Sequence, residues 1–138
     1  MKHLKTQTDW KKETLSQEIQ HDLFQMAFEL KDEGFDVSFQ AWPPYERSNP
    51  NWEKSKYPYI GISKWSSGGC VGIEYSEISE FVERVKDYLD GKGFNTRVRY
   101  ATMLAGIPTN VVLTSTNVKS VLYRVEIINR EIYGDVID

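Results

Sequence analysis

The side chains best suited to proton transfer and nucleophilic catalysis are scarce in this sequence. It contains two histidines, His3 and His21, and a single cysteine, Cys70. Histidine is the usual proton-transfer group near neutral pH, but we expect His3 in a frayed terminus and His21 at the solvent edge of a helix. Cys70 follows two glycines at the start of a predicted strand, which suits a reactive thiol, although free cysteine more often acts as a small buried apolar residue. A cysteine–histidine pair would require one of these histidines beside Cys70.

Metal-binding and phosphate-binding motifs are absent from the sequence. One cysteine and two distant histidines do not supply the ligands of a structural zinc site. Acidic pairs such as Asp87 with Asp90 lie at predicted helix ends, where solvated charges are more usual than general acids. Gly68-Gly69 has neither the spacing of a P-loop nor the lysine that belongs to one, and it suits a turn. We therefore expect no metal ion and no cofactor.

The predicted element order, helix–strand–strand–strand–helix–strand, also occurs in some metal-dependent nucleases. Those enzymes need an acid on the second strand and an acid-x-Lys on the third. Here the second predicted strand holds no acid, and Glu74 on the third is not followed by a lysine. Double-stranded RNA-binding domains share part of this order but carry a basic cluster at the start of the second helix, where this chain has Glu77 and Glu80. These mismatches favour a protein without catalytic activity.

One positive constellation remains, because aromatic and basic side chains gather between residues 42 and 65 and include three of the four tryptophans. Such side chains can stack on bases and contact phosphates. The same residue types dominate protein-interface hot spots, and they can also simply anchor a long loop to a sheet. Two arginines on one face of a later predicted strand would extend the patch. The candidate binding residues are Trp42, Tyr45, Arg47, Trp52, Lys54, Tyr57, Tyr59, Lys64, Trp65, Arg97 and Arg99.

Hydrophobic periodicity predicts the elements that would position these residues in the first half of the chain. Apolar residues at helical spacing predict a helix over residues 14–33. Strict alternation predicts a strand over 35–42, which two prolines end. Residues 43–56 have no periodicity and form a predicted long loop, of the kind that is often functional. Residues 57–65 and 70–75 predict a hairpin with a four-residue loop.

The second half of the chain shows the same two spacings of apolar residues, the helical one and the alternation of a strand. A narrow apolar stripe predicts a helix over residues 77–89, and alternation predicts a strand over 94–100. Residues 101–109 carry no clear signal, and 111–114 suit a short fifth strand. Apolar residues at helical spacing predict a third helix over 118–132. The fold class is therefore α+β: one domain over residues 1–138, with a mostly antiparallel sheet of four or five strands and about three packed helices in the order α-β-β-β-α-β-(β)-α.

Composition bounds the location and class of the protein. The 138 residues are 40% hydrophobic and 27% charged, which is normal for a globular domain. No apolar run approaches the ~20 residues that a membrane helix needs. A single cysteine favours a reducing intracellular compartment, the cytoplasm. The net charge of -3 argues against a dedicated binder of duplex DNA, since phosphate contacts supply most of the affinity of such proteins.

Two functional interpretations follow. The leading one is a small non-enzymatic intracellular binding protein that acts through an interface with a protein partner or with a second copy of itself. The alternative is a protein that binds a nucleotide or a single-stranded nucleic acid through the aromatic and basic patch.

Overall fold

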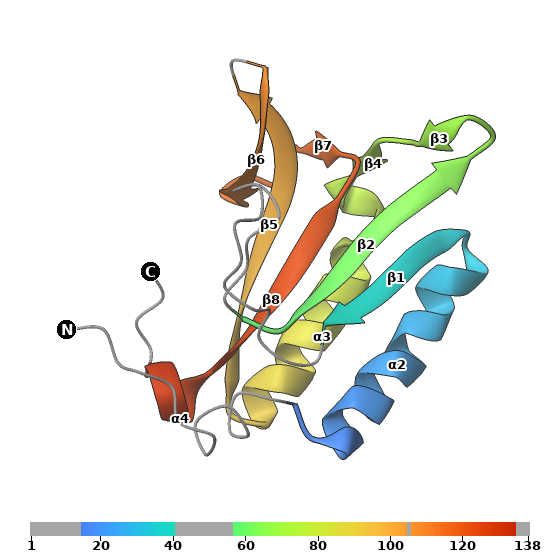
Figure 1. Cartoon of the computed structure of the whole chain (residues 1–138). Coiled ribbons are helices and arrows are strands. Elements are labelled where there is room, and N and C mark those ends of the chain that lie inside the picture. The colour runs from blue at the N-terminus through green and yellow to red at the C-terminus, as the bar shows by residue number, and fades with distance from the viewer. Residues whose placement is uncertain (1–14, 41–56, 105, 135–138) are drawn as a thin grey trace.

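A five-stranded antiparallel sheet in the order β1-β2-β8-β5-β6 forms the centre of the molecule (Figure 1). The computed structural model describes residues 15–40, 57–104 and 106–134. The short β3 pairs with β2, while β4 and β7 form a separate two-stranded sheet. The strands are β1 (Phe35–Gln40), β2 (Tyr59–Ser66), β3 (Gly69–Cys70), β4 (Ile73–Glu74), β5 (Phe94–Leu104), β6 (Ile107–Val112), β7 (Lys119–Ser120) and β8 (Tyr123–Asn129).

Two helices cover one face of this sheet (Figure 1). Helix α2 (Gln17–Asp32) packs on β1, and α3 (Ser79–Gly91) packs on β5 and against α2. A 3-10 turn, η2 (Tyr75–Glu77), leads into α3, and the short α4 (Arg130–Tyr133) follows β8. We call the sheet surface that points away from α2 and α3 the opposite face.

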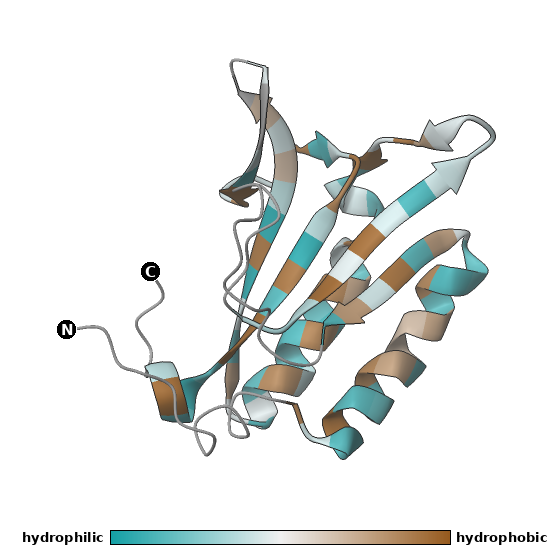
Figure 2. Cartoon of the chain, viewed as in Figure 1, coloured by the Kyte–Doolittle hydropathy of each residue, from teal (hydrophilic) through white to brown (hydrophobic). Residues whose placement is uncertain are grey.

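The core lies between the helices and the sheet. Alternate residues of each strand point to opposite faces, so hydrophobic and hydrophilic positions alternate along β2 and β8 (Figure 2). Apolar stripes of α2 and α3 meet the inward positions of the strands. Fully buried members of this core include Leu23, Ala27, Ile60, Ile62, Val82, Val85, Leu89, Tyr123 and Val125.

The predicted fold class is confirmed, with one strand more than expected in the sheet that includes β3. The helix predicted over residues 14–33 is α2, which begins after Ser16, whose Oγ accepts a hydrogen bond from the Ile19 amide at 3.3 Å. Gly34 follows the helix with a φ of 95°, a conformation that favours glycine. The helix predicted over residues 77–89 is α3, whose N-cap position is occupied by Ile78.

The single strand predicted over residues 70–75 is wrong, because the chain bends after β3 and leaves β2. β4 pairs instead with β7. At Gly72 a Cβ atom would lie 2.8 Å from Lys119 Cε, so the missing side chain lets these two segments approach. Gly61 allows a similarly close approach, since a Cβ there would lie 2.7 Å from Ser38 Oγ.

The strand predicted over residues 94–100 is longer than expected and belongs to a hairpin. β5 runs on to Leu104 and pairs with β6 from residue 99 onward. This hairpin takes up most of the unassigned residues 101–109, and Gly106 in its turn has a φ of 78°. The predicted fifth strand is therefore β6, which begins earlier than residue 111.

The helix predicted over residues 118–132 is wrong, since this segment contains β7, β8 and only the four-residue α4. β8 is the central strand of the sheet, between β2 and β5. Six of its seven residues are buried. A strand buried on both faces loses the clean alternation that would distinguish it from a buried helix.

The phenol of Tyr123 connects β8 to the small sheet. Its Oη donates a hydrogen bond to the Ile73 carbonyl oxygen at 2.7 Å, and the Val118 carbonyl oxygen lies 3.2 Å away. Burial raises the pKa of Tyr123 to about 12, although a backbone hydrogen bond involving Ser120 opposes this shift. Burial also raises the pKa of Tyr75, with a smaller effect from the Glu83 carboxylate.

These tyrosines predict a loss of stability at alkaline pH. A phenol ionises near pH 10 in the unfolded chain, so the unfolded state releases protons before the folded state does. The free energy of unfolding should be constant up to about pH 10 and fall as the pH rises toward 12. Urea unfolding across this range measures the effect, and Tyr123→Phe should make the decline shallower. An identical decline in Tyr123→Phe would contradict the assignment to this phenol.

Among the helices of the described residues, none combines the length and apolar character required to cross a membrane. The long loop predicted over 43–56 lies outside the described residues.

Candidate functional site

Three arginines and one glutamate form a cluster on the opposite face, where β5 and β8 lie side by side. Across these two strands Arg97 pairs with Glu126 and Arg99 pairs with Arg124. Glu126 is fully buried, at 0% exposure. Its Oε1 accepts a hydrogen bond from Arg97 Nε at 2.7 Å, and its Oε2 lies 3.9 Å from Arg99 Nη1. We refer to these four residues as the arginine cluster.

Like charges meet in the arginine cluster. Arg99 and Arg124 are directly opposite each other, an arrangement of like charges that is destabilising on its own. The carboxylate of Glu126 lies within ion-pair distance of Arg97 and Arg99, and it offsets part of this repulsion. Three guanidinium groups and one carboxylate therefore lie together on this face.

Two tyrosine rings flank the guanidinium groups. The Arg97 Cζ lies 5.6 Å from the ring centroid of Tyr57, which is buried and also packs edge-on against Tyr133 at 5.0 Å. The Arg124 Cζ lies 4.7 Å from the ring centroid of Tyr59. A cation over an aromatic face is attracted by the quadrupole of the ring. These contacts therefore hold two of the three arginines in defined positions.

Asn110 on β6 borders the arginine cluster. Arg99 Nη2 donates a hydrogen bond to the Asn110 carbonyl oxygen at 3.2 Å. The neighbouring Nε of Arg99 is shielded from solvent and has no hydrogen-bond partner, and the same holds for Nδ2 and Oδ1 of Asn110. Shielded polar atoms without partners are unusual in folded proteins, and each requires an explanation.

The structure brings four of the sequence-predicted residues together and separates two others. Tyr57, Tyr59, Arg97 and Arg99 meet on or beside the opposite face. Lys64 points to the helical side instead: its Nζ lies 4.9 Å from the ring centroid of Phe35 and 3.9 Å from Glu77 Oε1.

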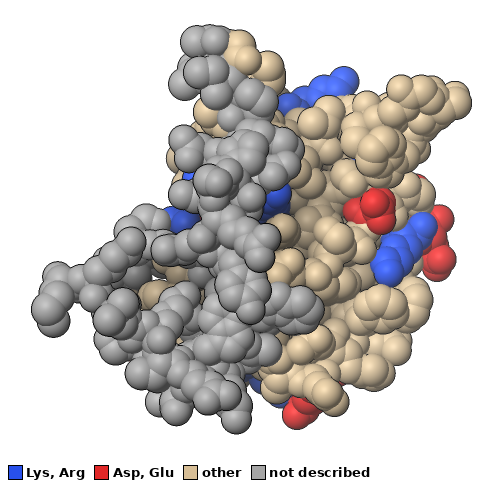
Figure 3. Space-filling view, in the orientation of Figure 1, with Lys and Arg blue, Asp and Glu red and all other residues tan. Residues whose placement is uncertain are grey.

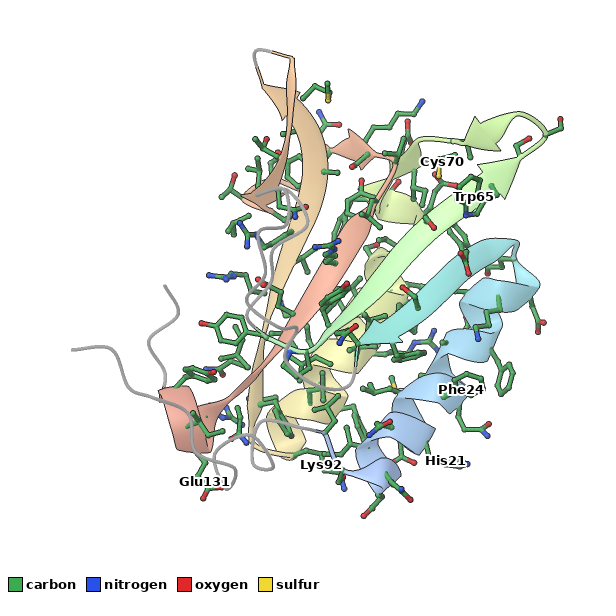
Figure 4. All side chains as sticks on the ribbon, viewed as in Figure 1. His21, Phe24, Trp65, Cys70, Lys92 and Glu131 are labelled. Carbon is green, nitrogen blue, oxygen red and sulfur yellow. The ribbon has the colours of Figure 1, made fainter. Side chains whose placement is uncertain are left out.

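Trp65 lies at the far end of β2 from Tyr59 and is 61% exposed. Its cross-strand neighbour is Cys70, which is also exposed, contrary to the expectation of a buried apolar thiol. Figure 4 shows both side chains together in the β2–β3 hairpin, far from His21 on α2. A catalytic pair of Cys70 with His21 is therefore excluded.

The remaining predicted site residues lie outside the described part of the chain. They are Trp42, Tyr45, Arg47, Trp52 and Lys54.

Two residues of the arginine cluster, Arg124 and Glu126, were missed by sequence reasoning, because residues 118–132 were predicted to be helical. The charged residues at 124 and 126 alternate with apolar residues at 123, 125 and 127, and this period of two was the available signal.

A second surface lies at the edge of the sheet. Phe24 and Phe28 of α2 are 43% and 44% exposed, and their rings meet edge-on with centroids 5.3 Å apart. The Phe24 ring also lies 6.0 Å from that of Phe39 on β1. Figure 4 places Phe24 on the side of α2 away from α3. We call Phe24, Phe28 and the adjacent strand β1 the aromatic edge.

Within the described residues, no three His, Cys, Asp or Glu side chains are grouped in a way that could hold a metal ion. Comparison of the chain with protein-family models, with curated proteins and with solved structures finds no match.

Proposed function

We propose that this chain is a non-enzymatic binding protein that recognises another protein at the aromatic edge. The partner contributes an extended segment that adds to the sheet beside β1. The observation that carries this proposal is the pairing of β1, which within the described residues is bonded to β2 only. An edge strand presents backbone N–H and C=O groups that can pair with a strand of another chain.

The exposed phenylalanines support the same binding mode. A strand added beside β1 would direct every second side chain toward the helical layer, where Phe24 and Phe28 lie beside β1. Apolar residues of the partner would bury these two rings. Large aromatic rings are among the residues that contribute most to the binding energy of protein interfaces.

The charges of α2 favour a partner segment that is not acidic. Lys31 Nζ lies 4.2 Å from the centroid of Phe24, but α2 also carries Glu18, Asp22, Glu29 and Asp32. The face drawn in Figure 3 is largely uncharged where it is described. We therefore propose a partner segment with apolar residues at alternate positions and no net negative charge.

Photo-crosslinking tests the proposed surface. With Phe28 replaced by p-benzoylphenylalanine, illumination in a lysate of the native host should yield one discrete protein adduct. The same replacement at the exposed Asp87 on α3 is the matched control and should yield none. With the purified partner, Phe24→Ala is expected to raise the Kd by about 30-fold, which corresponds to ~2 kcal/mol for an interface anchor.

An unchanged Kd in Phe24→Ala with Phe28→Ala would contradict the proposal, as would equal adducts from positions 28 and 87. An adduct between two copies of this chain would make the occupant a second copy. We place this function in the cytoplasm, because the single cysteine of the sequence suits a reducing compartment.

The second candidate function is binding of a nucleotide or of a single-stranded nucleic acid on the opposite face. The observation that favours it is the gathering of three guanidinium groups in the arginine cluster, next to the ring of Tyr59. Binding of this kind should weaken steeply with salt, since phosphate contacts release counterions. Titration of a fluorescent oligonucleotide at two salt concentrations tests it.

A further inference from the structure

We propose that the β6 edge of the sheet binds a second copy of this chain, so that two molecules join their sheets by antiparallel pairing of β6 with β6. This edge lies at the other end of the strand order from β1, and the proposal is independent of the protein partner proposed for the aromatic edge. Three observations carry it: the open backbone of β6, the absence of charge along it, and the exposure of Val111 and Val112.

The backbone of β6 is open on one side. Among the described residues, β6 pairs with β5 only. The amide of Leu113, just past β6, points toward β5 and donates a hydrogen bond to the Val98 carbonyl oxygen at 2.8 Å. Because backbone groups alternate in direction along a strand, those of Asn110 and Val112 point away from β5. The Asn110 carbonyl oxygen accepts one hydrogen bond from Arg99, and a carbonyl oxygen can accept a second one.

The outer part of the β5–β6 hairpin has little support from the rest of the sheet. β5 pairs with β8 over residues 94–100, whereas its pairing with β6 continues to Leu104. β7 supports the base of the outer part, where Ser120 Oγ donates a hydrogen bond to the Ala101 carbonyl oxygen at 2.6 Å. The hairpin then projects beyond β8 as a two-stranded ribbon (Figure 1). Such a ribbon is marginally stable in water by itself, and pairing with a second hairpin would give it four strands.

The composition of this segment favours a second copy as the occupant. Residues 100–118 contain no Asp, Glu, Lys or Arg, in a chain that is 27% charged. A two-fold interface brings the same surface of both copies together, so charges along the strand would repel across it. Edge strands that stay unpaired are commonly protected by charged side chains or proline. β6 has a proline at Pro108, near its turn, and residues 109–112 carry neither kind of protection. The other edge strand, β1, carries Asp36.

The exposed valines define the register. Val111 and Val112 are both 38% exposed, and as consecutive residues of a strand they face opposite sides of the sheet. With the two-fold axis at Val111, this residue lies opposite its own counterpart. Asn110 of each copy then exchanges both backbone hydrogen bonds with Val112 of the other. Pro108, which has no N–H, lies outside these four bonds, and β-branched valines pack well on the pleated surface of a sheet.

Sedimentation equilibrium of the full chain tests the proposal. A single pair of short strands is a small interface, so a dimer should form within a concentration series of about 5 to 500 μM. Val111→Lys and Val111→Glu each place like charges opposite each other, and each should weaken the dimer by at least about tenfold. An equimolar mixture of the two variants should dimerise again, because lysine then faces glutamate, and this recovery also shows that both variants fold.

Two exposed positions away from β6 supply the controls. Phe28→Lys at the aromatic edge and Val121→Lys at the bend before β8 should leave the dimer unchanged. Val111→Cys in a Cys70→Ser background changes the side chain less than a charge does. Its cysteine should form a disulfide between two copies on mild oxidation, since directly opposed residues of a non-hydrogen-bonded pair lie about 4.5 Å apart at Cα. Val121→Cys in the same background should not form it.

The remaining outcomes would overturn the proposal. They include a chain that stays monomeric over the whole series, a mixture of the two charged variants that does not dimerise, and equal crosslinking from positions 111 and 121. A dimer that Phe28→Lys disrupts and Val111→Lys leaves intact would also overturn it, and would assign the second copy to the aromatic edge. A chain that fails to dimerise but still gives the Phe28 adduct would remove this proposal and leave the proposed function standing.

Discussion

Glu126→Gln is expected to lower the free energy of unfolding by about 3 kcal/mol, because the substitution leaves Arg97 and Arg99 without the carboxylate that they share. Glu126 is fully buried and lies within ion-pair distance of Arg97 and Arg99. Glutamine keeps the shape of the side chain, so the loss measures charge and hydrogen bonding rather than packing. Urea unfolding of the wild type and the variant at pH 7 gives the difference.

Asp87→Asn is the matched control, since it removes one carboxylate from an exposed position on α3. It should change the free energy of unfolding by less than about 0.5 kcal/mol. A loss below about 1 kcal/mol in Glu126→Gln would contradict the role assigned to this carboxylate.

Phe81→Ala is expected to lower the free energy of unfolding by roughly 3–5 kcal/mol, the usual cost of removing a buried aromatic ring. The apolar spacing of residues 77–89 predicts Phe81 on the inner stripe of a helix together with Val82 and Val85. In the structure all three are buried, with Phe81 at 2% exposure. The cavity left by the ring would lie within the main hydrophobic core.

Lys86→Ala, at an exposed position of the same helix, should stay within about 0.5 kcal/mol of the wild type. The dependence of unfolding on urea should keep its slope in Phe81→Ala, since the substitution should not change the surface exposed on unfolding. A measured loss under about 1 kcal/mol would contradict this placement of the face of α3.

The two proposed surfaces are joined through β2. This strand pairs with β1 of the aromatic edge on one side and with β8 of the arginine cluster on the other. Gly61 lies at the crossing, with Ser38 opposite it on β1 and Arg124 opposite it on β8. Because this sheet is continuous, pairing of a partner strand with β1 and binding at the arginine cluster can be measured in one chain, with Asp87→Asn as the shared control.

The alternation of side chains along β2 shows which part of the site the sequence already contained. Lys64, Ile60 and Ile62 are alternate positions of the strand, so Lys64 lies on the helical side with the two isoleucines. Tyr59 belongs to the other set of positions and lies on the other face, where Arg124 packs on its ring. Trp65 belongs to the same set as Tyr59, but six residues of strand separate the two by about 20 Å. One patch of aromatic and basic residues in the sequence therefore becomes three separate locations in the fold.

Local periodicity and turn chemistry by themselves determined α2, β1 and α3. Each of these elements buries one face, so the spacing of Leu23, Ala27 and Leu30, or the alternation of Phe35 and Val37, reveals both its type and its inner side. Gly34 marks the end of α2 because glycine, which has no Cβ, adopts the positive φ required there more readily than other residues do.

The tertiary structure alone decided the centre of the sheet and the arginine cluster. β8 obtains its conformation from pairing with β2 and β5, which lie far from it in the chain. Because β8 is buried on both faces, its apolar residues do not alternate cleanly with polar ones, and the same amino-acid sequence also fits a helix. Arg124 and Glu126 meet Arg97 and Arg99 only once these strands are in register, because a cross-strand pair is set by the register of the ladder and by no local spacing.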